Sequence, residues 1–454
     1  MLSREQPMSA GDVMAPPDEA RCQDGTCAGT DAAGLIASPQ AVGELVELPL
    51  LTSPPLAAAR EQLTQAAPRS GIALSLHHDL DEIAIQWRSF QSEAHHTVFQ
   101  SFDWLAHWQR HIGAGRGTLP VIVIGHEPAS ETLFILPFAV ESTGPIRRLT
   151  WLGSQLCDYN APLVAQHFSD RVSAARFIAA WREVTDLLQL KARSRFDLID
   201  LQKMPECVGE QRNPFVDLRV HLHPSGAYIT DLGRDWDELY AAKRSGATRK
   251  RERRQLRQLA QFGKLTFVDV AGTDERTRTL TALFEQKSRA FARMGVDDLF
   301  LKPGRREFFL SLADDPSLHG LIHISRLDVG EQIAAAGVGL KFRNCYYLIL
   351  SSYADGELAR FGPGRAHLHE LLRYAIEQGC RHFDFTVGDE PYKHDWADTE
   401  LKLYDYLQAG STRGELLGLT IAQFRRVKRL IKQSPALWQV FRKGRALAAS
   451  LKSR

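Results

Sequence analysis

Apolar and polar residues follow the same order of patterns twice along this chain. The first series predicts a strand and a helix after Ile72, then a helix, two apolar strands in a hairpin, a third strand, a helix and a closing strand. These last six elements are expected at 101–113, 119–128, 132–141, 147–153, 171–192 and 196–202.

The second series repeats that order. It predicts helices at 281–295 and 305–313, three strands joined by tight turns within 318–354, a helix at 365–378 and a strand at 382–388. The closing strands also correspond, because SRFDLIDLQ and CRHFDFTVG both carry a Phe-Asp pair, at Phe196–Asp197 and Phe383–Asp384. We therefore expect a duplicated α/β domain, each copy with a mixed sheet covered by helices.

The segments outside the two series differ in composition. Residues 1–70 are rich in Ala, Gly, Pro and Ser without a sustained period, so we expect disorder there. The domains are then expected at 71–235 and 236–412. The tail, 413–454, is basic and amphipathic, which is typical of a docking helix with a charged outer face; contact with a partner protein or a membrane surface is the alternative.

Overall composition indicates a globular protein. The chain has 454 residues, 44% of them hydrophobic, and a net charge of +2, so bulk charge implies neither a nucleic-acid partner nor an acidic one. It contains no run of 18 apolar residues and no secretory h-region at its N-terminus, which predicts a cytoplasmic protein without a transmembrane helix.

The most informative motif is RFGPGRAHLHELLRYAIEQG. Gly379 is a natural helix stop. The apolar residues before it fall on one helix face: Leu368, Leu371, Leu372, Ala375 and Ile376.

Before this helix, Gly362 and Gly364 let the backbone turn sharply and approach a ligand closely. The first amides of the helix favour an anion, and Arg360 and Arg365 flank the turn. This pattern predicts a pyrophosphate cradle; the alternative is a plain turn that caps a packed helix.

The following sequence, FDFTVGDEPYKHDW, concentrates polar chemistry after a short strand. Asp384 or Asp389 is a candidate for deprotonating or orienting a nucleophile. Lys393 is a candidate for stabilising an oxyanion, and Tyr392 for protonating a leaving group. The alternative is a solvated loop anchored by a buried tryptophan.

A basic run upstream carries eight Lys or Arg residues between Lys243 and Arg257 against one acid, Glu252. No aromatic residues are interleaved, as nucleic-acid binding would favour, so we interpret the run as a solvated helix face. A contact with the phosphates of coenzyme A or with an anionic acceptor remains open.

The sequence contains none of the short motifs typical of serine hydrolases, P-loop nucleotide-binding proteins or zinc metalloproteases. The sequence has no G-x-S-x-G elbow, phosphate-binding G-x-x-x-x-G-K-[ST] loop or H-E-x-x-H pair, and we expect no metal site.

The segment GPGRAHLHELLRYAIEQGCRHFDFTVGDEPYKHDW resembles the BioF2-like, or CelD-type, acetyltransferase domain. Such proteins are similar to GNAT acyltransferases in tandem and are related to the FemAB aminoacyl transferases. The resemblance extends over about residues 85–412 and includes RRLTWLGSQLCDYNAPLV in the first half. The loop R-x-G-P-G-R departs from the usual Q/R-x-x-G-x-G/A of GNAT enzymes.

The resemblance implies acyl transfer from acyl-CoA (acetyl-CoA) to an amine or hydroxyl, with the donor site in the second half and a degenerate first half that helps form the acceptor cleft. It also implies a place in exopolysaccharide or cellulose production. Two alternatives stay open, which are a FemAB-like transferase that uses aminoacyl-tRNA and a non-catalytic scaffold of a polysaccharide-synthesis complex.

Overall fold

The computed structural model describes residues 69–127 and 131–433, so nearly all of the predicted disordered segment 1–70, and the tail beyond 433, lie outside the described residues. The first half contains an eight-stranded sheet with the order β1-β2-β3-β4-β6-β17-β9, in which β5 pairs with β3. The strands are β1 (Ala73–His77), β2 (Leu119–His126), β3 (Thr132–Thr143), β4 (Ile146–Trp151), β5 (Leu163–Val164), β6 (Leu198–Pro205), β9 (Val220–Leu222) and β17 (Leu403–Ala409).

Strand β2 shows how the sequence builds this sheet. Its side chains alternate between two cores, with Ile122 and Ile124 in one and Val121 and Val123 in the other. Because both faces are buried, the strand reads as a continuous apolar run. The principal helices of this half are α2 (Ala84–Glu93), α3 (Phe102–Trp108), the short α4 (Phe168–Arg171), α5 (Ala174–Leu190) and α12 (Thr412–Gln433).

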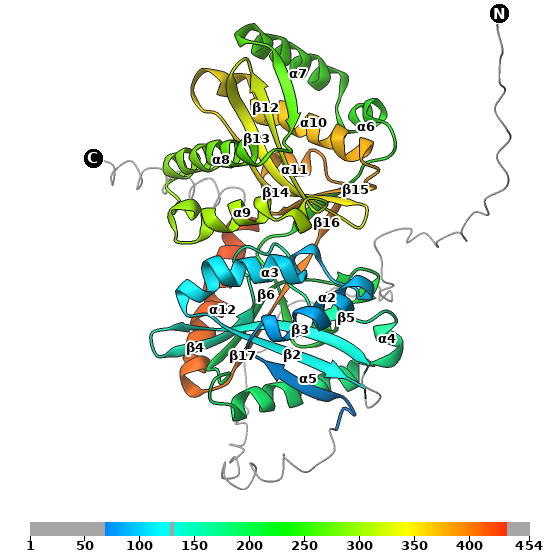
Figure 1. Cartoon of the computed structure of the whole chain (residues 1–454), viewed down its shortest axis with the longest axis vertical. Helices are drawn as coiled ribbons and strands as arrows, with labels where there is room; N and C mark the ends of the chain where they lie inside the picture. The colour runs from blue at the N-terminus through cyan, green and yellow to red at the C-terminus, as the bar shows by residue number, and fades with distance from the viewer. Residues whose placement is uncertain (1–68, 128–130, 434–454) are drawn as a thin grey trace, which may run out of the picture. The chain divides into compact units, whose positions relative to one another are not determined.

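The second half contains a seven-stranded sheet with the order β11-β12-β13-β14-β15-β10-β16. The strands are β10 (Ala227–Asp231), β11 (Leu265–Asp269), β12 (Ile322–Val329), β13 (Gln332–Phe342), β14 (Cys345–Tyr353), β15 (His382–Val387) and β16 (Thr399–Leu401). The helices are α6 (Trp236–Lys243), α7 (Gly246–Leu259), α8 (Thr273–Met294), α9 (Arg305–Asp314), α10 (Pro363–Glu377) and α11 (Pro391–His394). Helices α8 and α10 pack against opposite faces of the sheet through different buried clusters (Figure 1).

The predicted tandem of two mixed α/β sheets is confirmed, and so is the helix that carries the central motif. Its predicted apolar face is buried at Leu368, Leu371 and Leu372. The helix ends at Glu377, and Gly379 follows with a φ of +74°. The tail is helical as predicted up to Gln433.

The two sheets exchange a strand. Strand β17, late in the sequence, lies between β6 and β9 in the first sheet, where its orange ribbon stands among cyan and green strands (Figure 1). Strand β10, which precedes the second series, pairs with β15 in the second sheet. Each sheet therefore contains a strand from the other side of the boundary that we predicted between residues 235 and 236.

The halves also share a core. One buried cluster contains Trp104 and Trp108 of α3 together with Phe308 of α9, and the rings of Trp104 and Phe308 meet edge to face at 5.1 Å. Beside them His107 lies 3.0 Å from the carboxylate of Asp315. No helix within 69–433 has the length and apolar character needed to cross a bilayer.

Candidate active site

Strands β14 and β15 separate after a short parallel pairing. They pair only over Cys345–Tyr347 and His382–Asp384, and β14 is irregular near Leu350 in its register with β13. At the end of β15, Thr386 has a φ of +59°, which is rare for a residue other than glycine. The strands diverge where the sequence motif predicts the site.

A cavity of about 320 Å³ lies at this divergence. The end of β14, the start of α10, helix α7, the end of α6 and the segment after β15 line it. The lining residues include Ser351, Tyr353, Gly362, Gly364, Arg365, Arg244, Arg251, Tyr392 and Trp396. This volume is at the lower end of the range for small-molecule sites. Four residues that the sequence predicted therefore surround one cavity: Gly362, Gly364, Arg365 and Tyr392.

The start of α10 has the backbone that the cradle needs. Gly362 adopts a left-handed conformation with a φ of +69°, and Pro363 opens the helix. A Cβ atom at Gly364 would lie 2.9 Å from the ring of Tyr353, so a side chain there would crowd the cavity. The positive end of the helix dipole faces this space.

Arginine side chains add positive charge to the cradle. Arg244 is 9% exposed, pairs with Asp395 at 3.0 Å, and its Nε has no hydrogen-bond partner within the described chain. Arg365 donates a hydrogen bond to Gln255 at 2.5 Å, which joins α10 to the basic helix α7. Arg360 lies elsewhere, since it is exposed and pairs with Glu357 at 2.9 Å.

Asp384 lies where the two halves meet. It is 2% exposed, the hydroxyl of Tyr159 donates to both of its oxygens at 2.8 Å, and the Thr386 amide donates at 2.7 Å. Burial raises the pKa of Asp384 to about 7, although these donors favour the carboxylate. A carboxyl with this pKa exchanges a proton near neutral pH, as a general base must.

Lys393 is buried next to the same strand end. Its ammonium lies 3.0 Å from the Glu390 carboxylate and donates to the carbonyl oxygens of Val387 and Thr386 at 3.0 and 3.3 Å. All three N–H groups thus have a partner. The Lys393 ammonium can therefore contact an oxyanion only after it gives up one of these three hydrogen-bond partners.

The two remaining predicted residues differ in position. Tyr392 is half-buried, and burial together with the nearby Glu390 raises its pKa, so the phenol stays protonated. Asp389 is exposed and is hydrogen-bonded to Tyr228 of β10. The structure therefore brings Tyr392 to the cavity beside α10, whereas Asp389 does not line it.

The sequence analysis missed the contribution of the first half. Asp158 is hydrogen-bonded to Thr386 and lies near Lys203 and Lys393, and burial raises its pKa. Tyr159 follows it in the segment CDYN, which carried part of the resemblance but no assigned role. Only the packing of the two halves brings these side chains to Asp384, 225 residues away from Tyr159.

A second cavity, of about 330 Å³, adjoins the first and shares Glu252, Gly362 and Arg365 with it. Arg249 and Arg253 of α7 line it, together with Trp236 and Tyr240 of α6, whose rings stack at 5.1 Å. The sequence placed no aromatic residue within the basic run, but the fold supplies two from the preceding helix.

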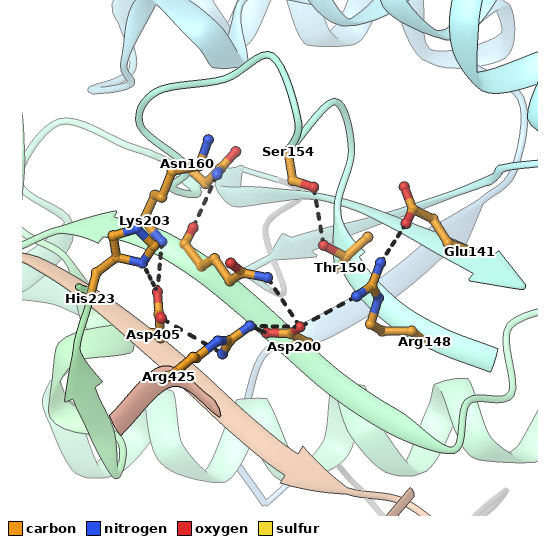
Figure 2. Close-up of polar contacts among 11 residues, drawn as sticks. Glu141, Arg148, Thr150, Ser154, Asn160, Asp200, Lys203, His223, Asp405 and Arg425 are labelled. Carbon is orange, nitrogen blue, oxygen red and sulfur yellow. Dashed lines mark hydrogen bonds and ion pairs between the residues drawn. The ribbon is translucent and has the colours of Figure 1, made fainter. Parts of the chain in front are cut away.

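The first half has its own buried polar network, which Figure 2 shows. Arg425 of α12 donates to both oxygens of Asp200 at 2.7 and 2.9 Å, and Arg148 lies between Asp200 and Glu141. Asp405 of β17 accepts from His223 at 2.8 Å. These groups mostly satisfy one another, so the network fastens α12 and β17 to the first sheet. No group of three or more potential metal ligands is found within the described residues.

Part of the chain matches a known family model. Residues 246–394 match the family described as "Acetyltransferase (GNAT) domain". The structure of FemX superposes with a TM-score of 0.50 at 11% identity, covering 74% of this chain and 97% of that one. Residues 246–394 thus match a GNAT-type acetyltransferase domain, and the likeness to FemX bears out the predicted fold.

Two further solved structures are less similar. A tandem GNAT protein from the clavulanic acid biosynthesis pathway has a TM-score of 0.42 at 13% identity, covering 74% of this chain and 98% of its own. The L-PGS structure from Bacillus licheniformis has a TM-score of 0.41 at 12% identity, covering 67% and 88%. No curated protein matches the chain.

Proposed function

We propose that this protein transfers an acyl group from an acyl-CoA, such as acetyl-CoA, to an amine or hydroxyl. The observation that carries the proposal is the cavity where β14 and β15 diverge, since it joins the start of α10, two close-approach glycines, three arginines and Tyr392. An anionic thioester donor fits these groups, with its phosphates at the helix start and Arg365. An acceptor from exopolysaccharide or cellulose production rests on the family resemblance alone.

In the proposed reaction the acceptor approaches from the side where Asp384 and Tyr159 meet. Asp384 takes the proton of the acceptor as its nitrogen or oxygen bonds to the thioester carbonyl carbon. Lys393 stabilises the oxyanion after it exchanges a partner, and the C–S bond then breaks. Tyr392 protonates the leaving thiolate. Asp384 then releases its proton to solvent, and Tyr392 regains one from solvent. Asp389, exposed and beside Tyr228, would act only in orienting the acceptor.

Calorimetric titration with acetyl-CoA and longer acyl-CoAs tests the donor site. We expect Arg365→Ala to weaken binding about tenfold or more, because a charge-assisted contact contributes about 1.5–3 kcal/mol. Arg360→Ala is the matched control, since that arginine starts the same motif but points to Glu357, and it should bind like the parent. Equal affinity in all three proteins would refute the cradle.

The second cavity favours an alternative donor, an aminoacyl-tRNA. Stacked rings beside the arginines of α7 form a surface of the kind that binds nucleotides. Under this alternative, filter binding of tRNA weakens steeply as salt rises, Trp236→Ala weakens it further, and acyl-CoA titrations give no heat.

A further inference from the structure

Helix α12 presents an apolar stripe to solvent. Four large side chains on it are exposed, at 70, 60, 69 and 53% for Leu416, Leu419, Phe424 and Val427. At 100° per residue they fall on one side of the helix. A stripe of this kind on a single helix is a typical interaction surface.

The opposite side of α12 fixes the direction of this stripe. A Cβ atom at Gly414 would overlap the carbonyl of Asp197, and one at Gly418 would lie 3.3 Å from Leu198, so the helix sits closely on β6. Arg425, on the same side, reaches the buried Asp200, as Figure 2 shows. Because these contacts fix the rotation of the helix, the stripe cannot turn inward.

Positive charge lies along one flank of α12. At 100° per residue Arg426 falls beside Leu419 at the edge of the stripe, whereas Arg429 falls on the side of Gly418. A small cavity of about 120 Å³ beside α12 is lined by His221, Leu222, Asp405, Arg425, Arg426 and Arg429, among others. Asp405 and Arg425 are engaged in the buried network, whereas Arg426 and Arg429 make no ion pair within 69–433. The free positive charge of the cavity therefore comes from these two arginines.

The sequence extends this charge. Thr412–Gln433 carries six Lys or Arg residues and 434–454 carries five more, against the single acid Glu415. A stable dimer buries roughly 800 Å² on each partner, more than four side chains of one helix provide. An apolar stripe bordered by excess positive charge instead matches the boundary between headgroups and acyl chains in an anionic bilayer.

We propose that α12 binds the surface of an anionic phospholipid bilayer, with Leu416, Leu419, Phe424 and Val427 inserted between the headgroups and Arg426, at the edge of the stripe, on a lipid phosphate. The inference does not depend on acyl transfer, because the donor cavity lies in the other half of the chain. It assigns a lipid surface, rather than a protein, to the tail contact.

Co-sedimentation of the full chain with vesicles tests this assignment. We expect binding to vesicles that contain phosphatidylglycerol, little binding to phosphatidylcholine alone, and weaker binding at high salt. Leu416→Gln, Leu419→Gln and Phe424→Gln together should reduce binding by about tenfold or more. Arg426→Gln should reduce it about fivefold, and Arg429→Gln, on the side of the helix that faces the sheet, should reduce it less.

Matched controls remove exposed apolar side chains elsewhere. Ile85→Gln and Leu301→Gln change residues that are 87 and 75% exposed, and vesicle binding should not change. All variants should melt like the parent, because the substituted side chains lie at the surface. Absence of binding to anionic vesicles, or undiminished binding of the triple variant, would overturn the proposal. The proposal would also be overturned if light scattering showed the parent protein to be a dimer and the triple variant to be a monomer.

Discussion

At the scale of single residues, the most consequential feature is the carboxyl of Asp384. The sequence shows an aspartate in a strand that alternates with phenylalanines, which predicts only that it faces away from them. Its properties come from burial against the first half and from the Tyr159 hydroxyl. Neither is visible in local sequence, because the contact spans the two halves of the chain.

Tyr159→Phe tests how Asp384 is tuned. The phenol donates to the carboxylate and so favours its charged form; its loss should raise the pKa of Asp384 further above 7. If Asp384 is the base, the acidic limb of the kcat/KM profile moves upward by about one pH unit. A uniform fall in activity without a shift of this limb would instead indicate a structural role for Tyr159.

The same carboxyl makes a prediction about stability. Its folded pKa, about 7, lies above the ordinary 3.8, so the folded protein keeps a proton that the unfolded chain releases as pH rises through this window. Asp384 thus favours folding below about pH 4 and loses that contribution by about pH 7. Relative to the parent, Asp384→Asn should gain roughly 3 kcal/mol of unfolding free energy between pH 5 and pH 8 in urea titrations.

Asp389→Asn is the control for this measurement, since it removes an exposed carboxyl from the same loop. A gain of similar size in both variants would show that burial of Asp384 is not the cause.

At the scale of elements, some parts of the site could be predicted from the sequence and others could not. Helix α10 follows from a five-residue apolar face and glycines at both ends, so local pattern sufficed. The exchange of β10 and β17 could not be predicted from local pattern. The β17 sequence, LYDYLQA, has the pattern of any half-buried strand, and nothing in it specifies which sheet it joins. The position of Arg244 in the cavity could not be predicted for a similar reason, because tertiary packing sets the orientation of α6 and α7.

Arg425→Ala tests the fastening of α12. Its removal leaves Asp200, which is 1% exposed, with a hydrogen bond from Gln202 at 3.1 Å and the longer 3.6 Å contact to Arg148. Loss of one partner from a buried pair typically costs about 3–5 kcal/mol, and we expect a loss near the lower value in urea unfolding because Arg148 remains. The neighbouring Arg426→Ala should change stability little. A small effect of both would mean that α12 adds little to the first sheet.

At the scale of the whole molecule, the exchanged strands and the shared core couple the two halves. Strand β17 pairs with β6 and β9 in the first sheet although only β16 of the second sheet separates it from the proposed active-site segment. Trp104 of the first half packs on Phe308 of the second. Separation of the halves would expose the edges of β6 and β15 and one face of a common core. Asp384 and Tyr159 therefore belong to one folding unit.

This coupling predicts one unfolding transition. Tyr406 of β17 is 7% exposed in the first core, where its hydroxyl accepts a hydrogen bond from Trp181 at 3.2 Å. Tyr406→Ala should destabilise the protein by about 3 kcal/mol. Although the donor cavity lies in the second half, the midpoint at which acyl-CoA binding is lost should fall with the circular dichroism midpoint. Tyr404→Ala, at a less buried position of β17, should lower both midpoints less. If acyl-CoA binding by the Tyr406 variant persisted after its circular dichroism signal was lost, the second half would fold alone. The contact between Asp384 and Tyr159 on the acceptor side would then form only after the second half had folded.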